Sequence, residues 1–327
     1  MKRIMFHFTL ILFLVSFVLS SSTLASEKPI VLKLAHITAG GGIIDKEANK
    51  LAELVEKKTN GKVKIDIYPA QQLGNMTEIL EGVSMGSIDM AVESEAFIEL
   101  FEKDITVFQA PFLLSREEIE KSDLLQQIRE KVRKQNGVRT LPGFGFRPGM
   151  HLWTQKRPVK TPDELKGIKL RLWQQKVQID VWNALGASAI PLPWGEVYMA
   201  LAQKIVNGMP HNIVQIKEEK FYEQLDYCTY LDFMPAYNAI WINDKKYQKL
   251  PKEVQKALNE SSVEAGKYFT SLGDSLENKA KQEIEKSGVK FFKTDRSIWL
   301  EKAKKVHINL EESGSWSKGI LKKLGKI

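Results

Sequence analysis

The residues best suited to binding chemistry gather in one stretch of the chain, between Gly167 and Asn212. Arg171 lies near the end of Ile168-Lys-Leu-Arg-Leu172, where apolar and charged residues alternate as in a half-buried strand. A helix pattern follows, and open α/β sheets bind ligands where strands feed helices. The residues expected on loops near the same edge are Trp173, Gln174, Trp194, His211 and Asn212. A lone arginine at a strand end is usually a solvated charge, but a guanidinium among aromatic and amide groups suits recognition of a small carboxylate.

Three further candidates come from other expected strands. Glu93 follows the strand Ile88–Val92 and should face the same cleft as Arg171. Its carboxylate could accept a ligand hydroxyl or ammonium, or it could be a solvated acid at a strand end, and both interpretations stay open. His36 in the strand from Val31 and Asn238 in the strand from Tyr237 complete this group of candidate ligand contacts.

Neither metal chemistry nor covalent catalysis is indicated. The histidines, at positions 7, 36, 151, 211 and 307, lack the spacing of a metal site, and Cys228 is the only cysteine, so no internal disulfide is expected. Gly82-Val-Ser-Met-Gly86 matches the G-x-S-x-G pattern of serine hydrolases, but here the helix precedes the serine and the strand follows it. We therefore expect no catalytic residue, no metal and no cofactor.

A glycine loop, Thr38-Ala-Gly-Gly-Gly42, enters the first helix pattern. Such a loop can bind an anion through free N–H groups. Neither G-x-G-x-x-G nor a phosphate-loop lysine is present, which disfavours a nucleotide. The loop is expected to border the ligand instead.

Composition bounds the class of protein. The chain has 327 residues, enough for two domains, and 43% of them are hydrophobic. Its net charge of +8 is spread over lysines interleaved with glutamates, which disfavours a nucleic-acid partner. Residues 1–25 begin with Lys2 and Arg3, continue as an apolar run and end in Thr23-Leu-Ala25. This pattern is typical of a secretory signal peptide.

The remaining elements must hold the candidate residues in place. Residues 31–68 read as β-α-β, and Gly143–His151 is an extended segment expected to cross between domains. Apolar residues from Val254 to Ile284 keep helical spacing for more than thirty positions, which predicts a helix over about 251–287. The expected organisation is a signal peptide at 1–25, a first lobe at 26–150, a second lobe at 151–236, and a return to the first lobe at 237–327 with the long helix and the C-terminal helices.

Several motifs carry a family resemblance. Lys166-Gly-Ile-Lys-Leu-Arg171, the segment from Gly186 to Leu201 (G-A-S-A-I-P-L-P-W-G-E-V-Y-M-A-L) and Val206-Asn-Gly208 resemble the signature region of the solute-binding proteins of tripartite ATP-independent periplasmic (TRAP) transporters, of the DctP type. Further matching motifs, in the family's order, are Leu32-Lys-Leu-Ala-His36, Gln72-Leu-Gly74, Pro158-Val-Lys-Thr-Pro162 and Leu250-Pro-Lys-Glu-Val-Gln255.

The resemblance implies an α/β, two-lobed periplasmic binding protein, type II-like, with a long helix spanning both lobes. It also implies that Arg171 holds a ligand carboxylate in a two-pronged salt bridge. His151 occupies the position at which many family members carry a second arginine, and His211 falls near a position that is commonly asparagine. These departures disfavour a sialic acid or a C4-dicarboxylate. One arginine and the flat walls of Trp173 and Trp194 favour a monocarboxylate with an apolar or aromatic body.

The function expected from this resemblance is capture of a small organic acid by lobe closure in the periplasm. The protein would then deliver the acid to a TRAP membrane permease, would have no enzymatic activity and would be a monomer. The alternative is a secreted enzyme of two α/β domains that acts on a small carboxylate.

Overall fold

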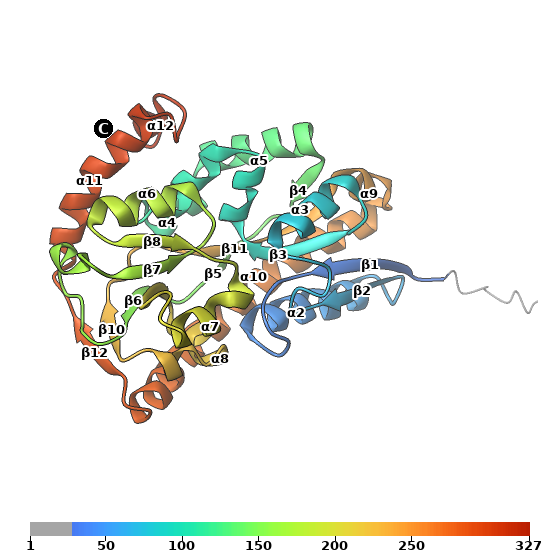
Figure 1. Cartoon of the computed structure of the whole chain (residues 1–327). Helices are drawn as coiled ribbons and strands as arrows, with labels where there is room; N and C mark the ends of the chain where they lie inside the picture. The colour runs from blue at the N-terminus through green and yellow to red at the C-terminus, as the bar shows by residue number, and fades with distance from the viewer. Residues whose placement is uncertain (1–27) are drawn as a thin grey trace, which may run out of the picture.

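The computed structural model describes residues 28–327, so the expected signal peptide lies outside the described residues. The described chain forms two six-stranded sheets, each surrounded by helices, which lie side by side as two lobes (Figure 1). No helix within residues 28–327 is both long enough and apolar enough to cross a bilayer.

The first sheet has the strand order β2-β1-β3-β11-β4, and β5 also pairs with β11. Its strands are β1 (Ile30–Ala35), β2 (Val63–Tyr68), β3 (Met90–Ser94), β4 (Val138–Thr140), β5 (Gly145–Phe146) and β11 (Tyr237–Asn243). The β-α-β prediction for residues 31–68 is confirmed, because β1 and β2 pair in parallel on either side of α2 (Ile43–Lys58). The helices that follow in this lobe are α3 (Met76–Met85), α4 (Arg116–Glu120), α5 (Asp123–Asn136) and α9 (Asp244–Lys249).

The second sheet has the strand order β12-β10-β6-β9-β7-β8. Its strands are β6 (Met150–Thr154), β7 (Lys169–Leu172), β8 (Ser188–Pro191), β9 (Gly208–Asn212), β10 (Tyr227–Tyr230) and β12 (Lys290–Lys293). The helices between them are α6 (Lys176–Leu185), α7 (Val197–Ala202) and α8 (Ile213–Glu218). Strand β8 lies at the edge of the sheet, where the missing N–H of Pro191 breaks no ladder hydrogen bond.

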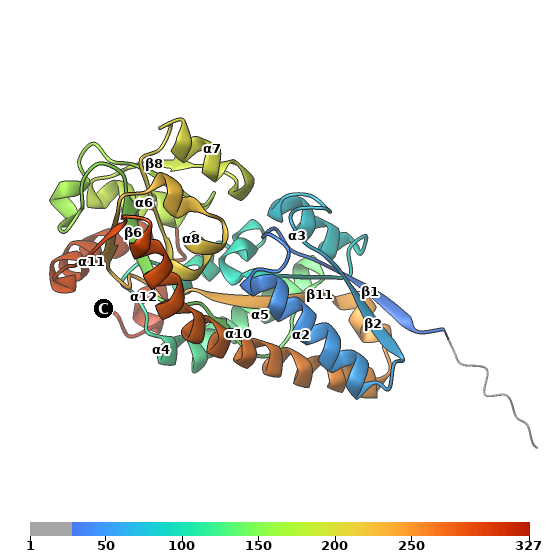
Figure 2. The same cartoon turned by 90° about the horizontal axis from the view of Figure 1, so that it is seen from below.

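The long helix α10 (Lys252–Lys286) is confirmed and serves both lobes. Its 35 residues extend about 52 Å at 1.5 Å per residue, and it runs beneath both sheets (Figure 2). Leu258 and Phe269 pack in the core of the first lobe, whereas Ala280 and Ile284 pack in the core of the second. One rigid element therefore fixes part of the geometry between the lobes.

The segment after α10 corrects the expected organisation. It was assigned to the first lobe, but β12 pairs in parallel with β10 of the second sheet. Helix α11 (Arg296–Glu312) packs against α6, with Trp299 edge-on to Trp182, and α12 (Ile320–Lys323) follows it. Side-chain contacts also tie this end to first-lobe segments: the Trp316 indole donates to Thr106 Oγ1 at 3.0 Å, and Lys326 pairs with Glu118 at 2.7 Å.

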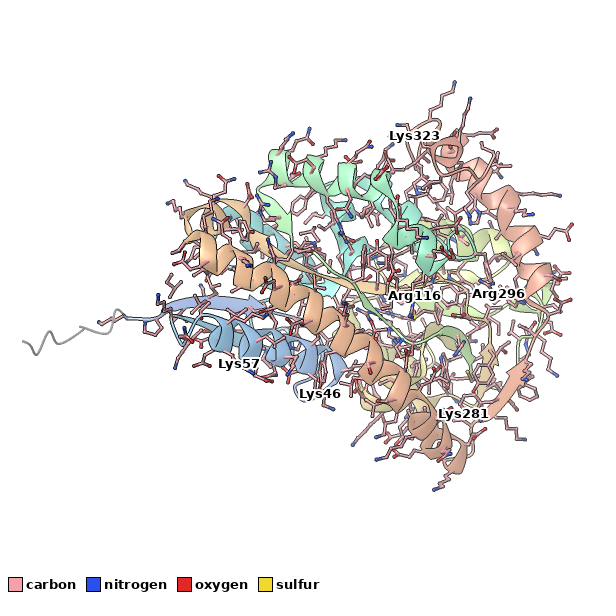
Figure 3. The ribbon with its side chains drawn as sticks, turned by 180° about the vertical axis from the view of Figure 1, so that it is seen from behind. Lys46, Lys57, Arg116, Lys281, Arg296 and Lys323 are labelled. Carbon is pink, nitrogen blue, oxygen red and sulfur yellow. The ribbon has the colours of Figure 1, made fainter. Side chains whose placement is uncertain are left out.

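The basic side chains are distributed over the surface. Lys46 and Lys57 lie on α2, Lys281 lies near the far end of α10, and Lys323 lies on α12 (Figure 3). Many lysines pair with glutamates one helical turn away, as Lys281 does with Glu285 at 2.7 Å. Such pairs explain how a net positive chain avoids a continuous basic stripe on these helices.

Candidate ligand-binding site

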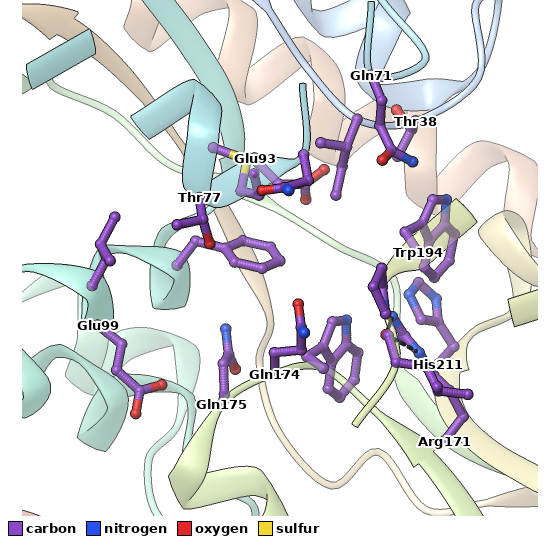
Figure 4. Close-up of a pocket in the computed structure, with 18 of the residues that line it drawn as sticks. Thr38, Gln71, Thr77, Glu93, Glu99, Arg171, Gln174, Gln175, Trp194 and His211 are labelled. Carbon is purple, nitrogen blue, oxygen red and sulfur yellow. Dashed lines mark hydrogen bonds between the residues drawn. The ribbon is translucent and has the colours of Figure 1, made fainter. Parts of the chain in front are cut away.

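A cavity of about 220 Å³ lies between the two lobes (Figure 4). The loops after β1 and β3 and the start of α3 line it from the first lobe, and the ends of β7, β8 and β9 line it from the second. Its lining residues are Ile37, Thr38, Gln71, Asn75, Met76, Thr77, Glu93, Phe97, Glu99, Leu100, Arg147, Arg171, Trp173, Gln174, Gln175, Leu192, Pro193, Trp194, His211 and Gln215. A molecule held there would touch both lobes.

Arg171 lies at the end of β7 and is almost fully buried, with 2% of its surface exposed. Its Nε and Nη2 both donate to the Leu192 carbonyl, at 3.1 and 2.8 Å, and its Nη1 has no hydrogen-bond partner among residues 28–327. The indoles of Trp173 and Trp194 lie 5.7 and 5.3 Å from the guanidinium. Burial lowers the pKa of Arg171 to about 9, because no carboxylate compensates its charge.

Arg147 is a second buried guanidinium in the lining, and it was not among the residues predicted from the sequence. Its Nε donates to Asn238 Oδ1 and its Nη1 to Gln215 Oε1, both at 2.8 Å, while its Nη2 forms an ion pair with Glu93 Oε1. All three nitrogens are thus occupied by protein groups. A basic residue in the glycine-rich crossing from Gly143 to His151 was the one signal that could have pointed to it.

Glu47 on α2 lies behind this ion pair. It accepts a hydrogen bond from Asn238 Nδ2 at 2.7 Å, and burial raises the pKa of its carboxyl to about 8. The Arg147 charge lowers this pKa and the Glu93 charge raises it. Glu47 is therefore mostly protonated at neutral pH, so Glu93 is the carboxylate that forms the ion pair with Arg147.

His211 lies in the lining beside both tryptophans, with ring centroids 4.9 Å from Trp194 and 5.7 Å from Trp173. Burial, followed by the charges of Arg147 and Arg171, lowers the pKa of His211 well below its ordinary value. The imidazole is therefore neutral at pH 7. It can give or take a hydrogen bond but adds no charge to the cavity.

The end of the cavity opposite Arg171 is also polar, but it is lined by hydroxyl, amide and carboxyl groups. Thr77, Glu99 and Gln175 lie there, across the cavity from Arg171 and His211 (Figure 4). Glu99 Oε2 is buried without a hydrogen-bond partner in the described chain, and burial raises the pKa of this carboxyl. This end offers acceptors rather than a second guanidinium.

Six of the ten residues selected from the sequence line the cavity: Arg171, Trp173, Gln174, Trp194, His211 and Glu93. Asn212 and Asn238 lie just outside the lining and hold residues that belong to it. Asn212 caps α8 by accepting from the Gln215 N–H at 2.9 Å, and its amide donates to Gln215 Oε1 at 2.7 Å. Asn238 links Arg147 to Glu47.

His36 and His151 do not line the cavity, contrary to the expectation that they face it. The His36 ring is fully buried between Thr38 Oγ1 at 3.2 Å and Asp45 Oδ1 at 3.1 Å, so it tethers the glycine loop to α2. The Nδ1 of His151 accepts from the N–H groups of Leu231 and Asp232 at 3.3 Å. These contacts hold its ring against the crossing segment, so position 151 does not supply the second cationic group.

The glycine loop borders the cavity at one end, as expected, and contacts the other lobe at its other end. Thr38 borders the cavity, but the N–H groups near the start of α2 face carboxylates of the other lobe. Glu218 Oε2 accepts from the Ile43 N–H at 3.2 Å, and Glu219 Oε1 accepts from the Trp194 indole at 3.2 Å and the Ala39 N–H at 3.5 Å. These contacts join the lobes at the mouth of the cavity.

Two sheets joined by a long helix, with one cavity-lining surface from each lobe, define the class of two-lobed periplasmic binding proteins. Solved structures agree with this class. A TRAP periplasmic solute-binding protein from Anaerococcus prevotii with bound glucuronate matches with a TM-score of 0.83 at 22% identity, over 91% of this chain and 97% of that one. One from Desulfovibrio salexigens with bound orotic acid matches with a TM-score of 0.81 at 24% identity, over 90% and 97%.

The chain belongs to the bacterial extracellular solute-binding protein family 7, whose model matches residues 34–313. The C4-dicarboxylate-binding periplasmic protein of Rhodobacter capsulatus is 28% identical over 300 residues, which are 90% of each chain. The resemblance stated from the motifs is therefore confirmed. The protein is a solute-binding receptor that works with a transporter, and the alternative of a secreted enzyme is set aside.

Proposed function

We propose that this protein captures a small organic acid carrying one carboxylate, and that Arg171 binds that carboxylate. The observation that carries the proposal is the buried Nη1 of Arg171, which lines the cavity without a hydrogen-bond partner in the described chain. A buried charge without a counter-ion is unfavourable. A ligand carboxylate would supply both the missing charge and the missing acceptor.

The charges around Arg171 support a ligand with a single negative charge. Arg147 and Glu93 cancel one another, and His211 is neutral because its pKa is lowered. Glu47 is mostly protonated at neutral pH. Among residues 28–327, Arg171 is then the one uncompensated charge at this end of the cavity, and one carboxylate balances it.

The walls of the cavity favour an acid with a flat apolar body. Trp173, Trp194 and Phe97 all line it, and aromatic faces bind planar groups well. Orotic acid, which the Desulfovibrio salexigens protein binds, is planar and has one carboxylate. Acceptors at the far end, such as Glu99, would suit a hydroxyl or amine donor on the ligand.

Capture would proceed by closure of the two lobes, with the protein acting as a monomer in the periplasm after removal of residues 1–25. The hinge would lie where the chain crosses between sheets, near residues 147–150 and 231–236. A ligand favours the closed state only to the extent that it contacts both lobes. The closed complex would then dock on a TRAP permease and release the acid there.

A thermal-shift screen of organic acids, including aromatic and hydroxy acids, identifies the ligand, because an acid that binds only the folded state raises the Tm. Calorimetry with that acid then tests Arg171→Ala. We expect an affinity loss of about 2–5 kcal/mol, or roughly 30- to several-thousandfold. Arg116→Ala, at an exposed residue that does not line the cavity, is the control. A loss of less than about threefold would remove Arg171 from the binding site.

A further inference from the structure

Two guanidinium groups line the same cavity, but only one of them has a charged protein partner. Arg147 donates hydrogen bonds from Nε to Asn238 and from Nη1 to Gln215, and its Nη2 pairs with Glu93. Two of these partners are neutral amides. Glu93 is the only charged partner of Arg147 among the described residues. The charge that Arg147 presents to a ligand is therefore set by Glu93.

Glu93 is held firmly in this role. It is 2% exposed, lies in β3, and its Oε1 also accepts from the Ser94 N–H at 2.8 Å. Its Oε2 is buried without a hydrogen-bond partner in the described chain, and the residue lines the cavity. A ligand carboxylate brought beside Arg147 would meet this carboxylate as well.

We propose that Glu93 determines specificity by neutralising Arg147 inside the cavity, so that the site accepts acids with one carboxylate and rejects those with two. The inference rests on the proposed function, because it takes Arg171 as the site of the first carboxylate. Discrimination of this kind uses an unfavourable contact for the wrong ligand as well as a favourable one for the right ligand. A second ligand carboxylate would find an occupied guanidinium and a like charge.

His211 marks where the second carboxylate would bind. It belongs to the lining together with both arginines, and after burial the positive charges of Arg147 and Arg171 are the next causes of its lowered pKa, so both guanidinium groups lie near it. A diacid would span this imidazole, with one carboxylate at Arg171 and the other at Arg147. Removing the negative charge of Glu93 should open that second position.

The single substitution Glu93→Gln is not sufficient as a test, because Glu47 can take the place of Glu93. Its carboxyl is one residue away from Arg147 in the hydrogen-bond network, through the Asn238 amide. The Glu93 charge helps to keep Glu47 protonated, so its removal favours ionisation of Glu47. An ionised Glu47 would neutralise Arg147 in place of Glu93. The test therefore needs the double variant Glu93→Gln/Glu47→Gln, in which neither carboxylate remains.

The experiment compares four proteins: wild type, Glu93→Gln, Glu93→Gln/Glu47→Gln, and Glu93→Gln/Arg147→Gln. Calorimetry measures the Kd of each for two matched pairs of probes, benzoate with isophthalate and succinamate with succinate. Within a pair, the probes differ mainly in the second carboxylate. Circular dichroism and urea unfolding establish that each variant is folded.

We expect wild type to prefer the monocarboxylate of a pair. The ratio of the two Kd values should shift toward the dicarboxylate by about tenfold or more in Glu93→Gln/Glu47→Gln, and by less in Glu93→Gln. The protein without both Glu93 and Arg147 should keep the wild-type ratio, because it has lost the second positive charge.

Three results would overturn the inference. The first is a wild type that binds the dicarboxylate of a pair more tightly than the monocarboxylate, and the second is a Glu93→Gln/Glu47→Gln variant that gains no dicarboxylate affinity in either pair. The third is a Glu93→Gln/Arg147→Gln variant whose dicarboxylate affinity rises as much as that of Glu93→Gln/Glu47→Gln. Failure of the proposed function is distinguishable from these. It would appear as unchanged monocarboxylate binding in Arg171→Ala, whatever ratios the Glu93 variants give.

Discussion

Arg171 and Arg147 are both buried arginines in the wall of one cavity, yet they have opposite surroundings. Within the part of the chain that the structure describes, Arg171 donates to a single neutral carbonyl and one of its nitrogens has no partner, whereas Arg147 donates to a carboxylate and two amide oxygens. Burial of a charge therefore does not identify a binding group by itself. What separates the two arginines is whether the protein already satisfies the guanidinium.

The two arginines should respond differently to substitution. A buried charge that lacks an ionic partner reduces the stability of the protein, whereas removal of one member of a buried ion pair strongly destabilises the protein. Arg171 accordingly has a lowered pKa, caused by burial alone. Its unfavourable burial is relieved when a ligand arrives, which couples ligand binding to stability.

The largest expected effect comes from Arg147→Ala. This change leaves the Glu93 carboxylate buried without its cation, so the free energy of unfolding should fall by about 3–5 kcal/mol. Urea denaturation measures it, with Arg296→Ala at an exposed position as the control. The double change Glu93→Leu/Arg147→Met should recover most of the loss. A fall of less than about 1 kcal/mol in Arg147→Ala would mean that the pair is not buried in the folded protein.

Glu47 provides the next largest effect, through pH. Its pKa is raised to about 8 in the folded state, above its ordinary value of 4.5, so the folded state holds a proton that the unfolded state releases. The stability contributed by this proton is complete below about pH 4.5 and is lost as the pH rises through 8. Between pH 5 and 7 it therefore falls by about 1.4 kcal/mol per pH unit.

Glu47→Gln removes this dependence. The stability of the variant relative to wild type should therefore rise steadily from pH 5 to pH 7 in urea unfolding. Glu53→Gln, at an exposed position on the same helix, should run parallel to wild type. Parallel curves for Glu47→Gln as well would show that Glu47 is ionised in the folded protein and shares Arg147 with Glu93.

Arg171→Met should have a smaller effect on folding, in contrast to Arg147→Ala. Because the guanidinium lacks a charged partner, an apolar side chain of similar length should change the free energy of unfolding by less than about 1 kcal/mol, or raise it. Ligand binding should nevertheless be lost. Unfolding and calorimetry on the same protein test this separation, and a large fall in stability would mean that Arg171 is structural, like Arg147.

The sequence was sufficient for elements whose signals are local. The alternation around Arg171 led to a correct placement of β7. The apolar spacing from Val254 to Ile284 did the same for α10, which begins and ends within one residue of expectation. Motif order also identified the family, since many short segments occurred together.

The network around Arg147 could not be predicted because its contacts span the whole chain. Glu93, Gln215, Asn238 and Glu47 are brought together by the pairing of β3 with β11 and by the packing of both α2 and α8 against α10. Position 151 illustrates the same limit. Alignment by motif gave its place in the chain, but the direction of its side chain depends on contacts with residues 231 and 232. Strand β12 likewise joined the second sheet through a parallel partner more than sixty positions earlier.

The smallest expected effect concerns the mouth of the cavity, where the lobes meet without a ligand. Glu218 accepts a hydrogen bond from the Ile43 N–H at the start of α2, where the helix dipole favours a negative charge and no side chain of the first lobe caps the helix. Glu218→Gln keeps the shape but removes the charge. We expect it to disfavour closure by about 0.5–1 kcal/mol, seen as two- to fivefold weaker ligand binding and a larger radius of gyration in ligand-free scattering.

Glu223→Gln is the matched control, because Glu223 accepts a hydrogen bond from Tyr198 within the same lobe. Equal effects of the two changes would place the Glu218 contact outside the closing motion.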